Sequence, residues 1–424
     1  MASKLSAQVG AVVFGRIFVS LVDSLKVFLL VRLMTKDSYG ALAFALAWQA
    51  TAIGLGQLAI PDSLLYFLPR LVPGIQRSLV KQSLLLLGVV GLGLGLVISM
   101  FALVPGLQPL DGPEMSGALL CVAVGTSLEL PAGVVASFLL GVQRHRSSAL
   151  VAMSLSLLAN ASLLIPAAMG ASTIDILTCY AAVSGIRLAV AWIAWRQVFK
   201  TVPALPFEGG LREQLAFALP LSLNGLAGLV NRYFWTYVVG WMLTAAAFAD
   251  YAIGGRELPF VSMIPYAVAT ALLPRFSELA GKAEDTASGA RAAIALWHPS
   301  IERVALVMMP IWILSLVEAE AMLTVFYGET YISAAVPFRI TAMLLPLRVT
   351  SYGVMLMALG RPRTILRAQL LGMGFNVLAT LPLLAWIHYG GDSAPDAGLR
   401  IAWACGVSVL ATYVCVVVML HDIG

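Results

Sequence analysis

Apolar windows long enough to cross a membrane recur along almost the whole chain, with only short polar breaks between them. A transmembrane helix needs about 20 mostly apolar residues, and every window reaches that length. The twelve predicted spans are residues 9–32, 39–67, 83–105, 117–141, 147–169, 174–196, 214–241, 246–273, 301–325, 333–359, 365–389 and 397–420. This pattern predicts an all-α polytopic membrane protein with twelve transmembrane helices.

The composition excludes several other classes of protein. Hydrophobic residues make up 60% of the chain and charged residues 11%, whereas a soluble domain has about 45–50% apolar and about 25% charged residues. These values exclude an ordinary soluble enzyme, a disordered chain and a nucleic-acid-binding protein with a solvated basic face, so we expect no nucleic-acid partner. The sequence has no Walker motif, no serine–histidine–aspartate arrangement and no zinc-ligand spacing. We therefore expect no catalytic residue, no metal, no cofactor and no enzyme activity.

The orientation follows from the 26 lysines and arginines. If the N-terminus is inside the cell, fifteen of them fall in the cytoplasmic segments and only three in the outer ones, Arg32, Lys36 and Arg400. Cytoplasmic loops collect lysine and arginine, and here the excess alternates correctly from loop to loop. The distribution predicts that both termini are cytoplasmic (N-in/C-in).

The other eight cations lie within the predicted spans. They are Arg16, Lys26, Arg187, Arg232, Arg256, Arg303, Arg339 and Arg348. A charge inside hydrocarbon is costly, so such residues face the interior of a helix bundle or a wet cavity. Arg187, Arg303 and Arg339 lie nearer the span ends, where snorkelling to the interface or structural pairing accounts for them. The deeper residues are predicted to line a cationic, substrate-binding cavity: Arg16, Lys26, Arg232, Arg256 and Arg348.

Interior acids are fewer than interior cations. They are Asp23, Glu129, Asp250 and Glu257. Asp23 and Lys26 are three residues apart, so an ion pair along one helix face is available. Even if each acid pairs with one cation, positive charge remains in excess, and the interior field favours an anionic guest. The acids either bind a coupling ion, H⁺ or Na⁺, or only neutralise arginines.

Internal similarity indicates that the chain contains a repeat. Residues 33–43 align with residues 242–252. At an offset of 208 residues, the polar positions of the first span, Arg16 and Asp23, coincide with two asparagines of the seventh. We therefore add these asparagines, Asn224 and Asn231, to the predicted polar-cavity or ion-coupling residues.

Two six-helix lobes follow from this repeat. They comprise residues 1–200 and 213–424, joined by a cytoplasmic linker at residues 201–212. Because six is an even number, the lobes have the same orientation and are related by a pseudo-twofold axis along the membrane normal. Repeats of this kind place a substrate site at their interface, and rocking of one lobe against the other gives alternating access.

Four segments resemble landmarks of one known family. The run Arg-Leu-Met-Thr-Lys-Asp-Ser-Tyr-Gly-Ala-Leu at residues 32–42 is similar to the segment after the first helix of the polysaccharide transport family. Residues 217–221, 272–279 and 325–331 are similar to its later landmarks and occur in the right order. That family comprises bacterial flippases for lipid-linked oligosaccharides, in the superfamily that also holds multidrug and toxin exporters and lipid II flippases.

The resemblance implies a two-lobed transporter with a central cavity in the inner (plasma) membrane. The implied substrate is an undecaprenyl-pyrophosphate-linked oligosaccharide, translocated to the outer leaflet for exopolysaccharide or lipopolysaccharide synthesis. Cavities in this family carry basic residues, and Arg16, Lys26, Arg232 and Arg256 match them by helix and depth. The expected partners are this substrate, membrane lipid and the polysaccharide polymerase machinery. We expect a monomer, because one chain already encloses the cavity.

Two other functions stay open. A cation-coupled multidrug antiporter of the same superfamily would use an acidic cavity, and eight interior bases against four acids argue against it. A membrane glycosyltransferase or polymerase would need long outer loops or catalytic acids in a loop, and the outer loops here are short.

Overall fold

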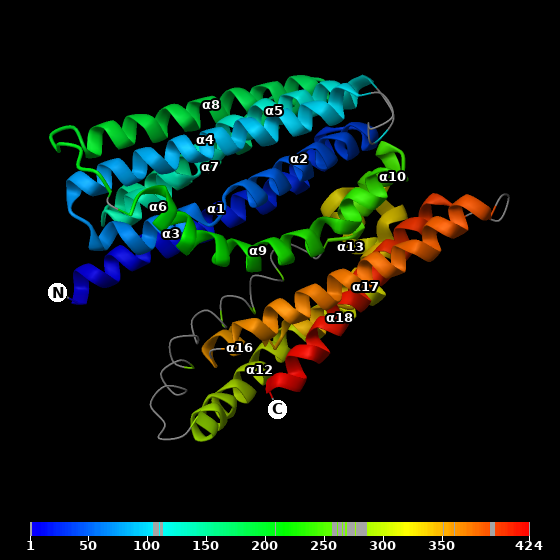
Figure 1. The fold of residues 1–424 in the computed structure, drawn as a ribbon. Coiled ribbons are helices and arrows are strands. Elements are labelled where there is room, and N and C mark those ends of the chain that lie inside the picture. The colour runs from blue at the N-terminus through cyan, green and yellow to red at the C-terminus, as the bar shows by residue number, and fades with distance from the viewer. Residues whose placement is uncertain are drawn as a thin grey trace. The chain divides into compact units, whose positions relative to one another are not determined.

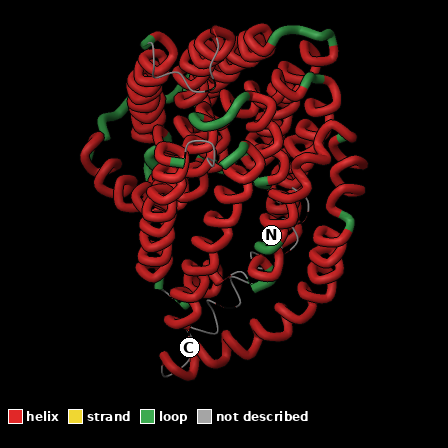
Figure 2. The backbone as a smooth tube through the Cα atoms, turned by 90° about the vertical axis from the view of Figure 1, so that its right-hand side faces the viewer, coloured by secondary structure: helices red, strands yellow, loops and turns green. Residues whose placement is uncertain are grey.

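The computed structural model describes residues 2–104, 110, 113–207, 209–256, 261, 265, 268, 276, 286–350, 352–359, 361–390 and 395–423. Every regular element in these ranges is a helix, and Figure 2 shows helices joined by loops with no strand in the coloured part of the chain. The chain divides into two compact units. Unit 1 comprises Met1–Leu229 with Thr244–Ala246, and unit 2 comprises Val230–Leu243 with Ala247–Gly424.

Unit 1 is a layered helical bundle. Its elements are α1 (Ala2–Leu33), α2 (Lys36–Gly56), α3 (Ile60–Phe67), η1 (Leu68–Arg70), α4 (Pro73–Leu103), α5 (Pro113–Ala132), α6 (Val134–Gly141), α7 (His145–Ala168), α8 (Thr173–Val198) and the first two thirds of α9 (Gly210–Gly240). Helix α5 packs between α4 and α8, and α7 packs against α1 and α8. Figure 1 shows α4, α5, α7 and α8 running alongside one another.

Local sequence signals account for the starts of two of these helices. Thr35 precedes α2, and its hydroxyl accepts a hydrogen bond from the Ser38 amide. Ser172 and Asp175 form a reciprocal capping box at the start of α8. Such caps satisfy backbone N–H groups that have no partner within the helix.

Unit 2 contains the last part of α9 and most of α10 (Ala245–Gly254). Its further elements are α12 (Thr286–Val317), α13 (Ala319–Tyr327), η2 (Glu329–Ala334), α14 (Ala335–Ala342), α15 (Leu345–Arg348), α16 (Tyr352–Ala358), α17 (Pro362–Tyr389) and α18 (Ala397–Ile423). Helices α17 and α18 pack side by side, and α14 packs on α18.

The helices confirm a multi-span membrane protein. Within the described ranges, eight helical segments are long and apolar enough to cross a membrane, and a ninth is reached if the bent pair Glu329–Ala342 and Leu345–Met357 forms one span. Each predicted window is mostly helical where it is described. The window at 246–273 lies mostly outside the described residues, so the total of twelve spans and the N-in/C-in orientation stay predictions.

Several windows that we predicted as single spans contain breaks between helices. In the window 39–67, Leu58 and Ala59 adopt left-handed φ angles of 46° and 51°, and α3 begins with Pro61 in its first turn. Proline fits the first turn of a helix, whereas in a helix interior it removes a hydrogen bond and costs stability, which favours a new helix start at this place. In the window 117–141, α5 ends directly after Pro131 and α6 starts at Val134, yet the stretch Glu114–Gly141 still qualifies as one apolar span, as predicted.

Glycines on one face of α4 allow close contact with α5. A Cβ atom at Gly91 would lie 3.0 Å from the Ser127 carbonyl oxygen, and one at Gly95 would lie 2.8 Å from the Ala123 carbonyl oxygen. Gly88 and Gly93 have no neighbour within 4 Å of that position. The glycine-rich sequence of α4 is therefore used for helix packing at two of these positions.

The start of α9 is anchored in unit 1. Gln214 is fully buried, and its amide nitrogen donates to Ser63 Oγ at 3.0 Å and to Ser83 Oγ at 2.8 Å. Its carbonyl oxygen accepts a hydrogen bond from Gln82 at 3.0 Å. Phe217, one turn later, stacks on Tyr66 with ring centroids 4.4 Å apart.

The predicted linker is packed against unit 1 along part of its length. The Leu205 amide donates to the Gly74 carbonyl at 3.1 Å, and Arg77 donates to the Val202 carbonyl. Phe207 contacts Phe67 edge-on, with ring centroids 5.8 Å apart. The boundaries 1–200, 201–212 and 213–424 stay predictions.

Candidate functional site: polar clusters inside the two units

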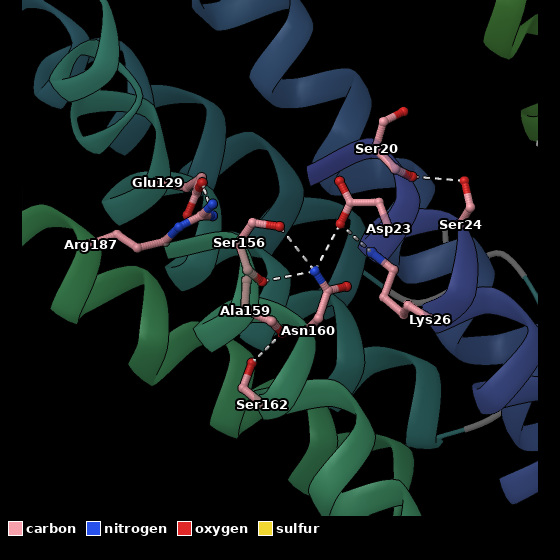
Figure 3. Close-up of polar contacts among 10 residues, drawn as sticks. All are labelled: Ser20, Asp23, Ser24, Lys26, Glu129, Ser156, Ala159, Asn160, Ser162 and Arg187. Carbon is pink, nitrogen blue, oxygen red and sulfur yellow. Dashed lines mark hydrogen bonds and ion pairs between the residues drawn. The ribbon is translucent and has the colours of Figure 1, made fainter. Parts of the chain in front are cut away.

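The first polar cluster of unit 1 joins α1 to α7 (Figure 3). Asp23 forms the predicted ion pair with Lys26, with Nζ and Oδ1 3.7 Å apart. Asn160 on α7 donates from its amide nitrogen to the same Asp23 oxygen at 2.9 Å and to the Ser156 carbonyl at 2.8 Å. Asn160 is only 3% exposed, whereas the Asp23 side chain is 48% exposed. The carboxylate is thus held in place on one side and open on the other.

The second polar cluster of unit 1 is an ion pair between α5 and α8. Arg187 donates from Nη1 to Glu129 Oε1, and the two side chains are 20% and 13% exposed. Figure 3 shows the pair reaching across the space between the two helices. Arg187 was predicted to snorkel or to pair structurally, and the pairing is confirmed. Glu129, which we predicted either to bind a coupling ion or to neutralise an arginine, is the partner.

The polar cluster of unit 2 joins α9 to α17. Asn231 accepts a hydrogen bond from the Asn376 amide and donates to Gln369 Oε1 at 3.1 Å. Trp235 donates from its indole nitrogen to Asn376 Oδ1 at 2.9 Å. Trp235 and Asn376 are 2% and 1% exposed. These four side chains are all uncharged.

The α1–α7 and α9–α17 clusters have the same plan. The sequence repeat aligns Asp23 with Asn231, and each of these side chains accepts a hydrogen bond from an asparagine, Asn160 in one unit and Asn376 in the other. The α1 member is a carboxylate beside Lys26, whereas the α9 member is an amide. The same interaction is therefore charged in unit 1 and neutral in unit 2.

Other predicted site residues lie elsewhere. Asp250 on α10 is 9% exposed and accepts a hydrogen bond from Ser333 Oγ at 2.8 Å. Arg339, predicted to snorkel or to pair structurally, bonds Glu320 Oε1 at 3.1 Å and the Leu316 carbonyl at 3.0 Å. Its pairing is confirmed.

Three of the predicted cavity cations are exposed: Arg232, Arg256 and Arg348. Arg232 lies about 12 Å along α9 from the end of that helix at Gly240, at a rise of 1.5 Å per residue. The side chains of Arg16 and Asn224, and the whole of Glu257, lie outside the described residues.

Sequence reasoning missed the partners of the aligned residues. Asn160, Asn376 and Gln369 were not predicted as site residues. The available signal was an amide side chain deep in an apolar window, because a buried polar group needs a hydrogen-bond partner. The two asparagines lie in the fifth predicted window of each half.

These observations define a class: an all-helical, multi-span membrane protein with paired polar clusters inside its two units. The chain belongs to the polysaccharide biosynthesis protein family, whose sequence model matches residues 81–336, more than half of its length. The resemblance to exporters of polysaccharide precursors is therefore confirmed at the level of the family. A comparison with curated protein sequences finds no match.

Solved transporters share this fold. The lipid II flippase MurJ, in an inward closed conformation, matches with a TM-score of 0.70 at 12% identity, over 98% of this chain and 87% of that one. The MATE transporter VcmN of Vibrio cholerae matches with a TM-score of 0.57 at 16% identity, over 99% and 97%. A superfamily transporter from Pyrococcus furiosus, described as having a binding pocket of reverse polarity, matches with a TM-score of 0.53 at 15% identity, over 97% and 94%.

Proposed function

We propose that this protein translocates a polyprenyl-pyrophosphate-linked oligosaccharide from the cytoplasmic to the outer leaflet of the plasma membrane, for surface polysaccharide synthesis. Two findings support this proposal. The chain belongs to a polysaccharide biosynthesis family, and it shares the fold of the lipid II flippase MurJ. The transport cycle alternates access to a cationic cavity, and the expected partners are the lipid-linked substrate, membrane lipid and polymerase machinery.

The exposed arginines of unit 2 favour an anionic substrate. Arg232, Arg256 and Arg348 lie within predicted spans, yet their side chains are exposed. A guanidinium at membrane depth needs water or a counter-charge, so we place these residues in a wet cavity, with Arg16 and Lys26 as further members. A guanidinium binds phosphate or carboxylate through two parallel hydrogen bonds, which suits a pyrophosphate and acidic sugars.

Asp23 is the proposed site of ion coupling. Its carboxylate is half exposed, lies beside Lys26 and is oriented by the buried Asn160. H⁺ or Na⁺ binding there would change the charge of α1 while Asn160 keeps the side chain in place. The remaining predicted polar residues serve as neutral or paired supports in this proposal: Glu129, Asn224, Asn231, Asp250 and Glu257.

The test is translocation of a lipid-linked oligosaccharide by the purified full chain in proteoliposomes. Arg256→Ala and Arg16→Ala should each reduce translocation at least tenfold while the protein stays folded in the membrane. Arg303→Ala is the matched control, because Arg303 is also exposed but lies at the edge of its predicted span. Wild-type rates in both cavity variants would refute the cationic cavity.

The drug-antiporter alternative is tested in the same vesicles. The similar structures include a MATE transporter, so a cationic dye is added alone and then together with the oligosaccharide. We expect no dye transport and no competition. Transport of the dye alone, without oligosaccharide translocation, would reassign the function to an antiporter.

A further inference from the structure

A group of buried polar atoms in unit 1 includes the second carboxylate oxygen of the Arg187–Glu129 ion pair. The buried side-chain atoms without a hydrogen-bond partner in the described part of the chain include Gln49 Nε2, Gln49 Oε1, Thr126 Oγ1 and Glu129 Oε2. Gln49 is 3% exposed and Thr126 is fully buried. Buried polar groups in native proteins are almost always satisfied by protein or by ordered water. Four unsatisfied atoms in one region therefore indicate a missing ligand.

The atoms belong to two helices, α2 and α5, which contact each other and α8. The starts of α2 and α8 are tied together by a hydrogen bond from Thr173 Oγ1 to the Ser38 carbonyl at 3.5 Å. Gln49 lies about 20 Å along α2 from Lys36, and Thr126 lies about 20 Å along α5 from Pro113, at 1.5 Å per residue. The Gln49 amide lies against α5 at Gly125. A Cβ atom added to Gly125 would be 3.3 Å from Gln49 Nε2.

Glu129 follows on the same face of α5. It lies one helical turn after Gly125, and side chains four residues apart stack on one face of a helix. Its Oε1 is used by Arg187 of α8, which leaves Oε2 as the unsatisfied atom. The site is thus bounded by α2, α5 and α8.

The chemistry of the four atoms selects the ligand. Gln49 Nε2 is a donor, Gln49 Oε1 and Glu129 Oε2 are acceptors, and the Thr126 hydroxyl is both. A metal cation satisfies only acceptors and would be repelled by the Arg187 guanidinium, which already neutralises Glu129. Water donates and accepts, and a buried water makes about three hydrogen bonds to such groups.

We propose that Gln49, Thr126 and the Oε2 atom of Glu129 hold ordered water at mid-membrane depth between α2, α5 and α8. The water hydrates the Arg187–Glu129 ion pair from the side that α8 leaves open. Water near a buried ion pair lowers the cost of removing the two charges from solvent. The site therefore provides a hydrated ion pair inside unit 1, independent of the proposed transport cycle.

The direct test is an experimental structure of the full chain in lipid nanodiscs at a resolution that shows ordered water. We expect density within hydrogen-bond distance of the Gln49 amide, Thr126 Oγ1 and Glu129 Oε2. A dry site in which the Gln49 amide bonds Glu129 directly would overturn the proposal.

The unfolding midpoint gives an independent test, because a hydrated site and a dry site predict changes of opposite sign. In a hydrated site, Gln49→Met and Thr126→Val each remove a water ligand and lower the unfolding midpoint. In a dry site, they remove an unsatisfied polar group, and the midpoint rises or stays unchanged, which would contradict the proposal. Gln214→Met is the matched control for buried glutamine, because its hydrogen bonds are all made within the protein and its loss lowers the midpoint in either case.

A cation is tested with the same variants. Midpoints should be equal in sodium, potassium and choline chloride at one ionic strength. A rise specific to sodium that is lost in Gln49→Met would assign the site to a cation and overturn the assignment to water.

Discussion

Removal of Arg187 is the perturbation with the clearest energetic consequence. Its guanidinium binds Glu129 across α5 and α8, and both side chains are at least four-fifths buried. Two unit charges about 4 Å apart interact by roughly 4 kcal/mol at an effective dielectric constant of 20. Removing one partner of a buried pair costs about 3–5 kcal/mol, because the other charge stays buried without compensation. We therefore expect Arg187→Met to destabilise unit 1 by about 3–5 kcal/mol, and Glu129→Gln to have a smaller effect of the same sign.

A double-mutant cycle measures this coupling. The assay is reversible unfolding in mixed detergent–SDS micelles, followed by tryptophan fluorescence. Replacing both charges, as Glu129→Leu with Arg187→Met, should cost far less than the sum of the two corresponding single changes, because replacing a buried ion pair by apolar side chains is often neutral. Equal and additive losses, or a loss below about 1 kcal/mol for Arg187→Met, would refute the description of these residues as a coupled buried pair.

Three further changes test packing and pairing. Gly95→Ala should lower stability, because the new methyl group would meet the Ala123 carbonyl at 2.8 Å, whereas Gly93→Ala should be neutral or stabilising by up to about 1 kcal/mol from helix propensity; thermal unfolding separates the two. Gln214→Leu should cost about 2–3 kcal/mol in SDS unfolding, since three hydrogen bonds of about 1 kcal/mol each are lost. Arg339→Ala should cost less than about 1 kcal/mol in the same assay, because the pair with Glu320 is largely exposed, and a larger loss would show that the Leu316 contact dominates.

The sequence was sufficient for features that depend on one helix or on spacing along the chain. The Asp23–Lys26 pair follows from a separation of three residues, and the helical windows follow from hydropathy. The internal repeat aligned Asp23 with Asn231, and these positions make matching contacts in the two units.

Features that depend on contacts between helices were not predictable in the same way. The side chain of Asn160 reaches Asp23 only because α7 packs on α1, and no local pattern specifies that neighbour. The break at Leu58 and Ala59 was missed because neither residue is a glycine, although both adopt left-handed φ angles. Pro61 marked the place, but proline also occurs inside uninterrupted helices of this chain, as Pro220 does in α9.

Helix α9 is shared between the units, and this has a consequence for how the protein is made and divided. Its residues up to Leu229 belong to unit 1, and those from Val230 belong to unit 2. Gln214 completes a polar contact with side chains of α3 and α4 that are synthesised more than a hundred residues earlier. During translation, Ser63, Ser83 and Gln82 of unit 1 therefore gain this hydrogen-bond partner only after the start of α9 has been synthesised. A split gene that ends the first fragment at residue 200 would produce an incomplete bundle, whereas a split after α9 would carry the anchor with it.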